Sequence, residues 1–317
     1  MNRRHFNKIA ALSSLGLASG TIQSQGAAHA SKSSKPLSVS VFSKHLQFLN
    51  YKETAKIAKE IGFDGVDLTV RPGGHVEPEN AKRDLPNAVE AIRSEGLQSA
   101  MMTSGVNNAD DPVNIQVLNT ASEQGIKYYR TSYYRVKGMK LPSWKATLDP
   151  FKKQFDVLGK LNKKLGLHGA YQNHSGIYVG SYLPDIAYLL EGNDPQWLGC
   201  QFDIRHATVE GATAWPLGLE WIKEHISTIV AKDFKWGVKD GALQPVNVPI
   251  GQGVVDFVGY FKLLRKYEIQ PQVSMHYEYE LGGANHGDRE LTIPRDQVYE
   301  AMIIDLKKLQ ELWLASA

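Results

Sequence analysis

Two side chains that can do chemistry follow one short apolar segment of the chain. Residues 199–202 are predicted to form a buried strand, with Asp203 at its end and His206 three positions later. In parallel α/β proteins the carboxyl ends of the strands carry the functional groups. A carboxylate and an imidazole at such an end indicate a metal site or an acid/base pair. The structural alternative is that Asp203 caps the following loop and His206 lies on the surface.

The rest of the chain repeats one pattern, in which a short apolar segment alternates with an amphipathic one. The predicted strands are residues 38–42, 65–70, 98–103, 128–132, 169–173, 199–203, 229–233 and 272–277. The predicted helices are residues 51–61, 85–95, 112–124, 143–165, 183–190, 216–225, 256–267 and 294–314. This alternation predicts an α/β fold, a (β/α)8 TIM barrel. A doubly wound open sheet is the alternative, but it would want a glycine-rich phosphate turn after the first strand, and residues 43–46 contain no glycine.

Polar side chains gather at the ends of these predicted strands. Five of the histidines lie there, namely His45, His75, His174, His206 and His276. The further polar residues at strand ends are Arg71, Arg130, Gln172, Asp203, Lys232 and Glu278. Each histidine alone could be an ordinary core or loop residue. A random scatter would rarely give the whole set, so we expect a functional site at this end of the barrel.

Strand alternation indicates which of these side chains share a face. If Gln172, Asp203 and His276 all point to the barrel axis, they could meet around one ion. Oxygen and imidazole ligands suit Mn²⁺, Mg²⁺, Co²⁺ or Zn²⁺. No thiolate narrows this choice, because the single cysteine, Cys200, lies low on its strand. The sequence therefore predicts one divalent metal ion of unknown identity.

The first thirty residues indicate export. Arg3 and Arg4 belong to a twin-arginine pattern, a weakly apolar run follows, and residues 28–30 (AHA) suit a signal peptidase. We expect a twin-arginine signal peptide at residues 1–30, a linker at 31–36 and one barrel domain at 37–317. The predicted location is the periplasm or another exported compartment, without stable membrane insertion. A basic tail is the alternative interpretation.

The charge of the chain excludes some partners. The sequence has 36 basic and 33 acidic residues, and the predicted leader holds three of the basic ones and no acid. The remaining chain is near neutral, so nothing favours nucleic acid or an anionic membrane. We expect a small-molecule partner, and a homo-oligomer is compatible with the sequence.

Longer motifs resemble a known family. They are residues 42–46 (FSKHL), 58–68 (AKEIGFDGVDL), 172–174 (QNH), 203–206 (DIRH), 232–233 (KD) and 248–253 (VPIGQG). Over residues 37–317 the chain resembles the sugar phosphate isomerase/epimerase family, the xylose isomerase-like TIM barrels. The resemblance implies one divalent ion held by two glutamates, an aspartate and a histidine. It also implies that these acids move a proton between neighbouring sugar carbons.

The resemblance can be carried over residue by residue. Asp203 matches the aspartate, and His206 matches a histidine that touches substrate. Gln172 stands in place of one glutamate, Val230 in place of the metal-binding histidine, and His276 or Glu278 in place of the second glutamate. A glutamine cannot abstract a proton. The remaining candidates for catalysis are His174, His206, Lys232, His276 and Glu278, with Lys232 able to stabilise an enolate oxygen. For substrate binding we predict His45, Arg71, His75 and Arg130.

These features predict a metal-dependent sugar isomerase or epimerase that acts on a free sugar or sugar derivative. The ion would acidify the proton next to a carbonyl, and a histidine or Glu278 would move it. A lyase acting on a keto-glycoside shares this first step and needs only one base. A sugar-binding barrel without activity is the alternative from another class. An endonuclease IV-like phosphodiesterase would demand more metal ligands and a basic face.

Overall fold

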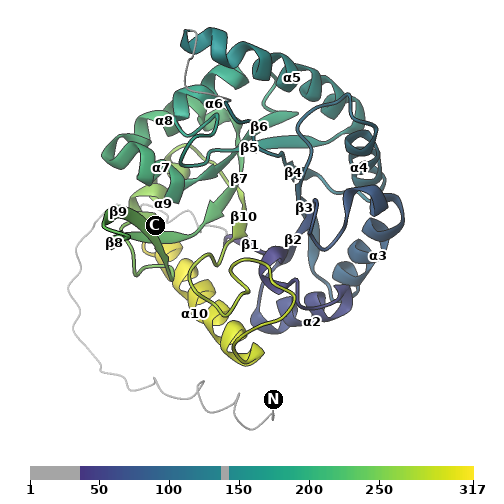
Figure 1. The fold of residues 1–317 in the computed structure, drawn as a ribbon, viewed down its shortest axis with the longest axis vertical. Helices are drawn as coiled ribbons and strands as arrows, with labels where there is room; N and C mark the ends of the chain where they lie inside the picture. Colours follow the sequence, from purple (N-terminus) through teal and green to yellow (C-terminus); the bar gives the residue numbers. More distant parts are fainter. Residues whose placement is uncertain (1–35, 137–142) are drawn as a thin grey trace, which may run out of the picture. The chain divides into compact units, whose positions relative to one another are not determined.

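The computed structural model describes residues 36–136 and 143–317, which form one compact unit. The predicted leader and most of the predicted linker lie outside the described residues, so both remain predictions. The described residues form a closed barrel of parallel strands surrounded by helices (Figure 1). The (β/α)8 TIM barrel fold predicted from the sequence is therefore confirmed.

Eight strands close the barrel. In spatial order they are β1 (Ser38–Phe42), β10 (Gln272–Met275), β7 (Ile226–Ala231), β6 (Leu198–Asp203), β5 (His168–Gln172), β4 (Tyr128–Arg130), β3 (Gln98–Ser104) and β2 (Gly65–Val70). Every neighbouring pair is parallel, for example Asp203 beside Val230 and Gln172 beside Gln201. All eight carboxyl ends therefore open at one mouth of the barrel.

Helices connect the strands on the outside. They are α2 (Tyr51–Ile61), α3 (Ala81–Ser94), α4 (Pro112–Glu123), α5 (Trp144–Leu165), α6 (Leu183–Leu190), α7 (Ile204–Gly211), α8 (Trp215–Ile222), α9 (Phe257–Lys266) and α10 (Arg295–Leu314). Helix α2 shows how local sequence sets these bounds. Asn50 and Glu53 form a reciprocal capping box at its start, and Gly62, in the left-handed region, ends it.

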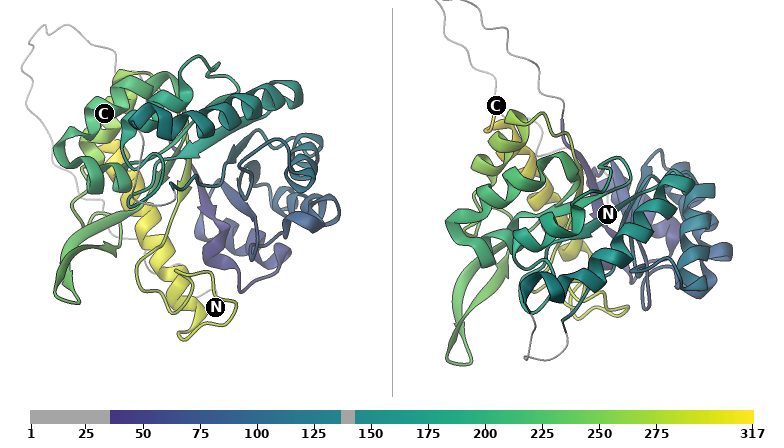
Figure 2. Two further views of the ribbon diagram at one scale, coloured as in Figure 1. Left: turned by 45° about the horizontal axis from the view of Figure 1, so that its top comes forward. Right: turned by 90° about the horizontal axis from the view of Figure 1, so that it is seen from above.

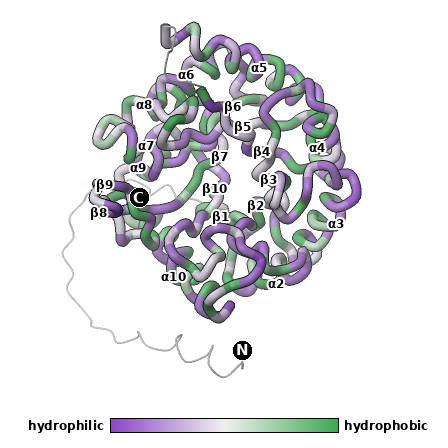
Figure 3. Tube along the Cα trace, in the orientation of Figure 1, coloured by the Kyte–Doolittle hydropathy of each residue, from purple (hydrophilic) through white to green (hydrophobic). Residues whose placement is uncertain are grey.

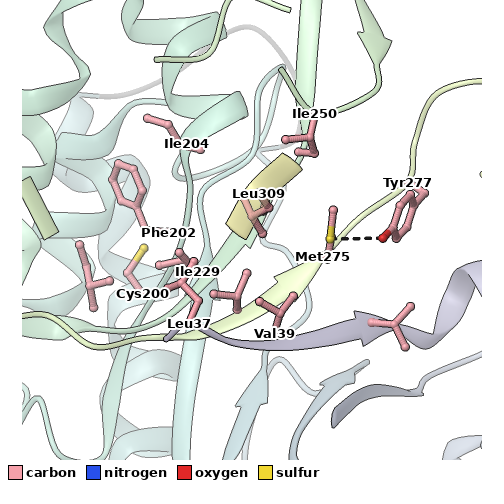
Figure 4. Close-up of a cluster of buried hydrophobic side chains, with 14 of the residues drawn as sticks. Leu37, Val39, Cys200, Phe202, Ile204, Ile229, Ile250, Met275, Tyr277 and Leu309 are labelled. Carbon is pink, nitrogen blue, oxygen red and sulfur yellow. Dashed lines mark hydrogen bonds between the residues drawn. The ribbon is translucent and has the colours of Figure 1, made fainter. Parts of the chain in front are cut away.

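Alternation along each strand separates a helix-facing side from an axial side. Cys200 and Phe202 of β6 belong to the same buried hydrophobic cluster as Ile229 of β7 and Met275 of β10 (Figure 4). Asp203 points the other way and contacts polar groups at the mouth. Side chains alternate between the two faces of a strand, so Gln201, two residues before Asp203, also points to the axis.

One helix and one hairpin of two strands were not predicted. Helix α7 begins directly after Asp203, whose side chain accepts a hydrogen bond from the backbone N–H of His206 at 3.0 Å. Strands β8 (Asp233–Lys239) and β9 (Ala242–Val248) form an antiparallel hairpin that extends away from the barrel (Figure 2). Its turn holds Asp240 and Gly241, both at positive φ.

A helix that spans a membrane needs about 20 consecutive, mostly apolar residues. Among residues 36–136 and 143–317, no helix is long and apolar enough to cross a membrane. Hydrophobic and hydrophilic residues alternate along the long helices α5 and α10, as Figure 3 shows. Such alternation is typical of helices that cover a core with one face.

Candidate active site

A buried lysine lies at the centre of the barrel mouth. Lys232 follows β7, and its Nζ lies 3.2 Å from Asp203 Oδ2 and 3.2 Å from each carboxylate oxygen of Glu278. The same Nζ donates a hydrogen bond of 2.9 Å to Nε2 of His206. Two acids and an imidazole from two strand ends, those of β6 and β10, thus surround one ammonium group.

The two carboxylates keep this ammonium charged. Burial alone would lower the pKa of Lys232, but the charges of Asp203 and Glu278 outweigh burial and raise it. Burial would raise the pKa of Glu278, yet Lys232 and His276 hold it well below its usual range. The mouth therefore contains a fixed positive charge between fixed negative ones at neutral pH.

Gln172, the last residue of β5, fixes the position of Asp203 by a hydrogen bond. Its Nε2 donates to Asp203 Oδ2 at 2.7 Å, while its Oε1 accepts from Arg130 at 2.8 Å and from the hydroxyl of Tyr133 at 2.6 Å. These two donors fix the orientation of the amide, because the guanidinium has no acceptor. Gln172 consequently presents N–H groups, and no oxygen, to the centre of the site.

Two cationic side chains approach the ring nitrogens of His206. Lys232 Nζ lies 2.9 Å from Nε2 and a guanidinium nitrogen of Arg205 lies 3.1 Å from Nδ1. Because the contact with Lys232 is the shorter, we assign the acceptor to Nε2 and the proton to Nδ1. That proton points to Ser175 Oγ at 2.7 Å, and Arg205 donates to the same hydroxyl at 3.2 Å. Burial, with Lys232 adding to it, holds the pKa of His206 well below its usual value. His206 is therefore neutral, and its free electron pair is already used by Lys232.

His174 has a free electron pair. Its Nδ1 donates to the backbone carbonyl of Ser175 at 2.8 Å, and its Nε2 has no hydrogen-bond partner among the described residues. The ring lies between Tyr133, Tyr178 and His206, with centroid distances of 4.9, 4.6 and 4.0 Å. Burial lowers the pKa of His174 to about 4. The imidazole is neutral at physiological pH and able to accept a proton.

A polar chain continues from Glu278 down the barrel axis. His276 Nδ1 lies 3.4 Å from Glu278 Oε1, and its Nε2 lies 3.2 Å from Ser274 Oγ. Ser274 donates to Asp67, which also accepts from Thr103 at 3.0 Å. Asp67 and Thr103 were not predicted as site residues, although each lies on the axial face of a predicted strand. Strand alternation applied to 65–70 and 98–103 would have found both.

The predicted metal ligands do not form a metal site. The described residues contain no group of three or more His, Cys, Asp or Glu side chains able to hold an ion. Gln172 offers a donor, and His276 faces Ser274 and Glu278 instead of the centre. Val230, in the place of a histidine ligand, is apolar and fully buried. The residues present do not fit the divalent ion predicted at Gln172, Asp203 and His276.

The four residues predicted to bind substrate divide into two pairs. Arg130 contacts Gln172 at the mouth, and the guanidinium of Arg71 lies 5.4 Å from the ring centroid of Phe42, which stacks on His276. His45 is buried, with both ring nitrogens within 3.0 Å of the backbone of Ala284 and Tyr277. The other histidine of the set, His75, bonds hydroxyl groups beneath α2, including Ser43 Oγ at 3.1 Å. Neither histidine joins the cluster around Lys232.

A family model described as xylose isomerase-like TIM barrel matches residues 55–301. The chain belongs to this family. The family resemblance that we saw in the sequence is thereby confirmed. No curated protein sequence matches the chain.

Solved structures of this family share the fold at low identity. A 3-keto-D-glucoside 4-epimerase from E. coli in its apo form is 15% identical, with 87% of this chain and 99% of that chain covered and a TM-score of 0.62. A D-allulose 3-epimerase from Methylomonas sp. is 13% identical, with 87% and 99% covered and a TM-score of 0.61. A xylose isomerase-like TIM barrel protein from Mycobacterium smegmatis in complex with magnesium is 12% identical, with 89% and 98% covered and a TM-score of 0.61.

Proposed function

We propose that this protein is an enzyme of the sugar isomerase/epimerase type. It removes the proton next to a carbonyl group of a free sugar or sugar derivative. The observation that carries this proposal is a neutral imidazole with a free electron pair, His174, next to the group that holds the buried ammonium. The His174 ring centroid lies 4.0 Å from that of His206, whose Nε2 accepts from Lys232. The two epimerases of similar fold, which act on a 3-keto-D-glucoside and on D-allulose, support sugars as the substrate class.

The chemistry divides between these two groups. A carbon-bound proton next to a carbonyl becomes acidic only when the enolate oxygen that forms is stabilised. Lys232 supplies a fixed positive charge for that oxygen, in a site that is already organised. His174 Nε2 accepts the proton. Its return to the neighbouring carbon, with a proton moving between the two oxygens of the enediolate, gives the isomer. Delivery of a proton from water to the opposite face of the same carbon gives the epimer. Tyr133 offers an aromatic surface beside His174 for a sugar ring.

A lyase acting on a keto-glycoside is the second candidate. Its first step is the same proton transfer to His174, after which the electrons of the enolate expel the oxygen of the neighbouring glycosidic bond. The aglycone leaves and takes up a proton from water, and an unsaturated keto-sugar remains. Gln172 favours this candidate, because its amide cannot serve as the second base that a two-base epimerisation requires.

We further propose that the enzyme works outside the cytoplasm. The twin-arginine pattern of residues 2–8 and the AHA sequence at 28–30 support this location. Replacing Arg3 and Arg4 together by lysine is expected to retain the protein in the cytoplasm, which cell fractionation measures. Unchanged fractionation would argue against twin-arginine export.

Exchange of carbon-bound protons with solvent tests the reaction. The full chain is incubated in deuterated water with a panel of ketoses, aldoses and 3-keto-glycosides, and deuterium uptake is followed by NMR. We expect uptake at the carbon next to the carbonyl of at least one member. Epimer formation would assign the isomerase reaction, and release of the aglycone would assign the lyase reaction. Saturable binding without any exchange or turnover would contradict the proposal and show a sugar-binding barrel.

A further inference from the structure

The ammonium of Lys232 lies where the four metal positions implied by the family resemblance converge. Those positions are Gln172 on β5, Asp203 on β6, Val230 on β7 and the residues following β10. Lys232 Nζ contacts the acids of two of them, Asp203 and Glu278, at 3.2 Å. At the third position, the side-chain amide of Gln172 donates a hydrogen bond of 2.7 Å to the same oxygen, Asp203 Oδ2. The fourth is the apolar Val230.

Charge and space both disfavour a second cation here. A divalent ion bound to Asp203 and Glu278 needs their oxygens at about 2.0–2.6 Å, and Nζ already contacts the same oxygens. Two buried cations a few ångströms apart repel strongly in a medium less polar than water. The imidazole of His206 is also committed, since its Nε2 accepts from Lys232 at 2.9 Å.

We propose that Lys232 is the permanent cation of this site and replaces the metal ion, so that the protein functions without one. Lys232 is the cation that lies between Asp203, His206 and Glu278, the three side chains that we call the cage. This role is the same for either candidate reaction and also for a site that only binds a sugar.

Removing the lysine should create the metal site that the natural chain lacks. In Lys232→Ala the cage would offer two carboxylates and the Nε2 of His206, a ligand set that suits Mn²⁺ or Zn²⁺. We expect Mn²⁺ or Zn²⁺ to raise the melting temperature of Lys232→Ala and EDTA to reverse the rise. The same ions should leave the melting temperature of the natural chain unchanged. Lys232→Arg, which keeps the charge, and the exposed Lys235→Ala should behave like the natural chain.

Elemental analysis of the purified natural chain completes the test and does not depend on how the variant folds. We expect substoichiometric metal and a melting temperature that EDTA does not change. One divalent ion per chain, with a melting temperature that falls in EDTA, would overturn the proposal. A folded Lys232→Ala variant that shows no response to either ion would overturn it as well. Neither result bears on the proton-exchange assay, so failure of one proposal is distinguishable from failure of the other.

Discussion

His174 is the residue on which the proposed proton transfer depends most directly. His174→Gln keeps a polar side chain but removes the electron pair of Nε2. Loss of a general base typically costs about a hundredfold or more in rate, so we expect solvent-deuterium exchange to fall by at least that factor. The melting temperature should change little, because Nε2 has no partner among the described residues. The exposed His286→Gln serves as the control, and an unchanged exchange rate in His174→Gln would assign the base elsewhere.

Asp67 gives the protein a pH-dependent stability that can be measured without substrate. Burial raises its pKa to about 6, so the folded chain holds this proton more tightly than the unfolded chain. The resulting stabilisation is fully present below the unfolded pKa of about 3.9 and is lost as pH rises through about 6.

Asp67→Asn removes this titration. Relative to the variant, the natural chain should lose about 1 kcal/mol of unfolding free energy between about pH 5 and about pH 7.5. Urea unfolding at several pH values measures this, with the exposed Asp110→Asn as control. A stability difference between the two proteins that stays constant over this range would show that Asp67 is ionised at both ends of it.

Individual side chains were only partly predictable from the sequence. Asp203, His206, Lys232 and Glu278 come together because the barrel brings three separate stretches of the sequence to one mouth. Their partners were not predictable, because Tyr133, Ser175 and Asn247 belong to loops and the hairpin base, where no periodicity fixes the direction of a side chain. Asn247 shows the consequence, since it links Arg205 at 2.8 Å to the backbone of Glu278 at 3.2 Å.

At the scale of elements, periodicity placed every barrel strand and eight helices with shifts of at most four residues. The β8–β9 hairpin was missed although its signal was present. Asp240 and Gly241 form the Asp-Gly pair that two-residue hairpin turns favour. The flanking strands conceal this signal, because their polar and exposed residues, such as Lys235 and Lys239, do not alternate clearly with apolar ones.

The loop after the hairpin is organised by Asp233. Its carboxylate accepts the backbone N–H groups of Gly251 and Gly253 at 3.0 Å and that of Val255 at 3.2 Å. Glycine turns such as residues 249–253 can bind phosphate through their backbone N–H groups. Here Asp233 accepts those of Gly251 and Gly253, so the segment serves as a rigid turn.

Gly253→Ala tests this loop. A Cβ at Gly253 would lie 2.2 Å from both Asp233 Oδ1 and the carbonyl oxygen of Phe234. We expect a loss of about 1–3 kcal/mol in unfolding free energy, as for other overpacked sites. Gly105→Ala, whose nearest contact would be at 3.4 Å, is the matched control. Equal unfolding free energies for both variants would contradict this packing.

At the scale of the whole molecule, the barrel was predictable because the pattern of a strand followed by a helix repeats eight times. An error in the bounds of one repeat does not change the fold that the other repeats indicate. The site was less predictable because the cation between the acids depends on where one flexible side chain, Lys232, places its ammonium. The sequence shows both the acids that hold a metal in the family and the lysine that follows β7. Only the position of Lys232 Nζ, 3.2 Å from oxygens of both acids, favours the lysine.

The most direct test of the account is solvent-deuterium exchange by the natural chain before and after exhaustive treatment with EDTA, on a substrate identified from the panel. Lys232 is a covalent part of the protein and cannot be chelated. We therefore predict the same exchange rate before and after the treatment. Exchange that is lost in EDTA and restored by adding a divalent ion would contradict the account.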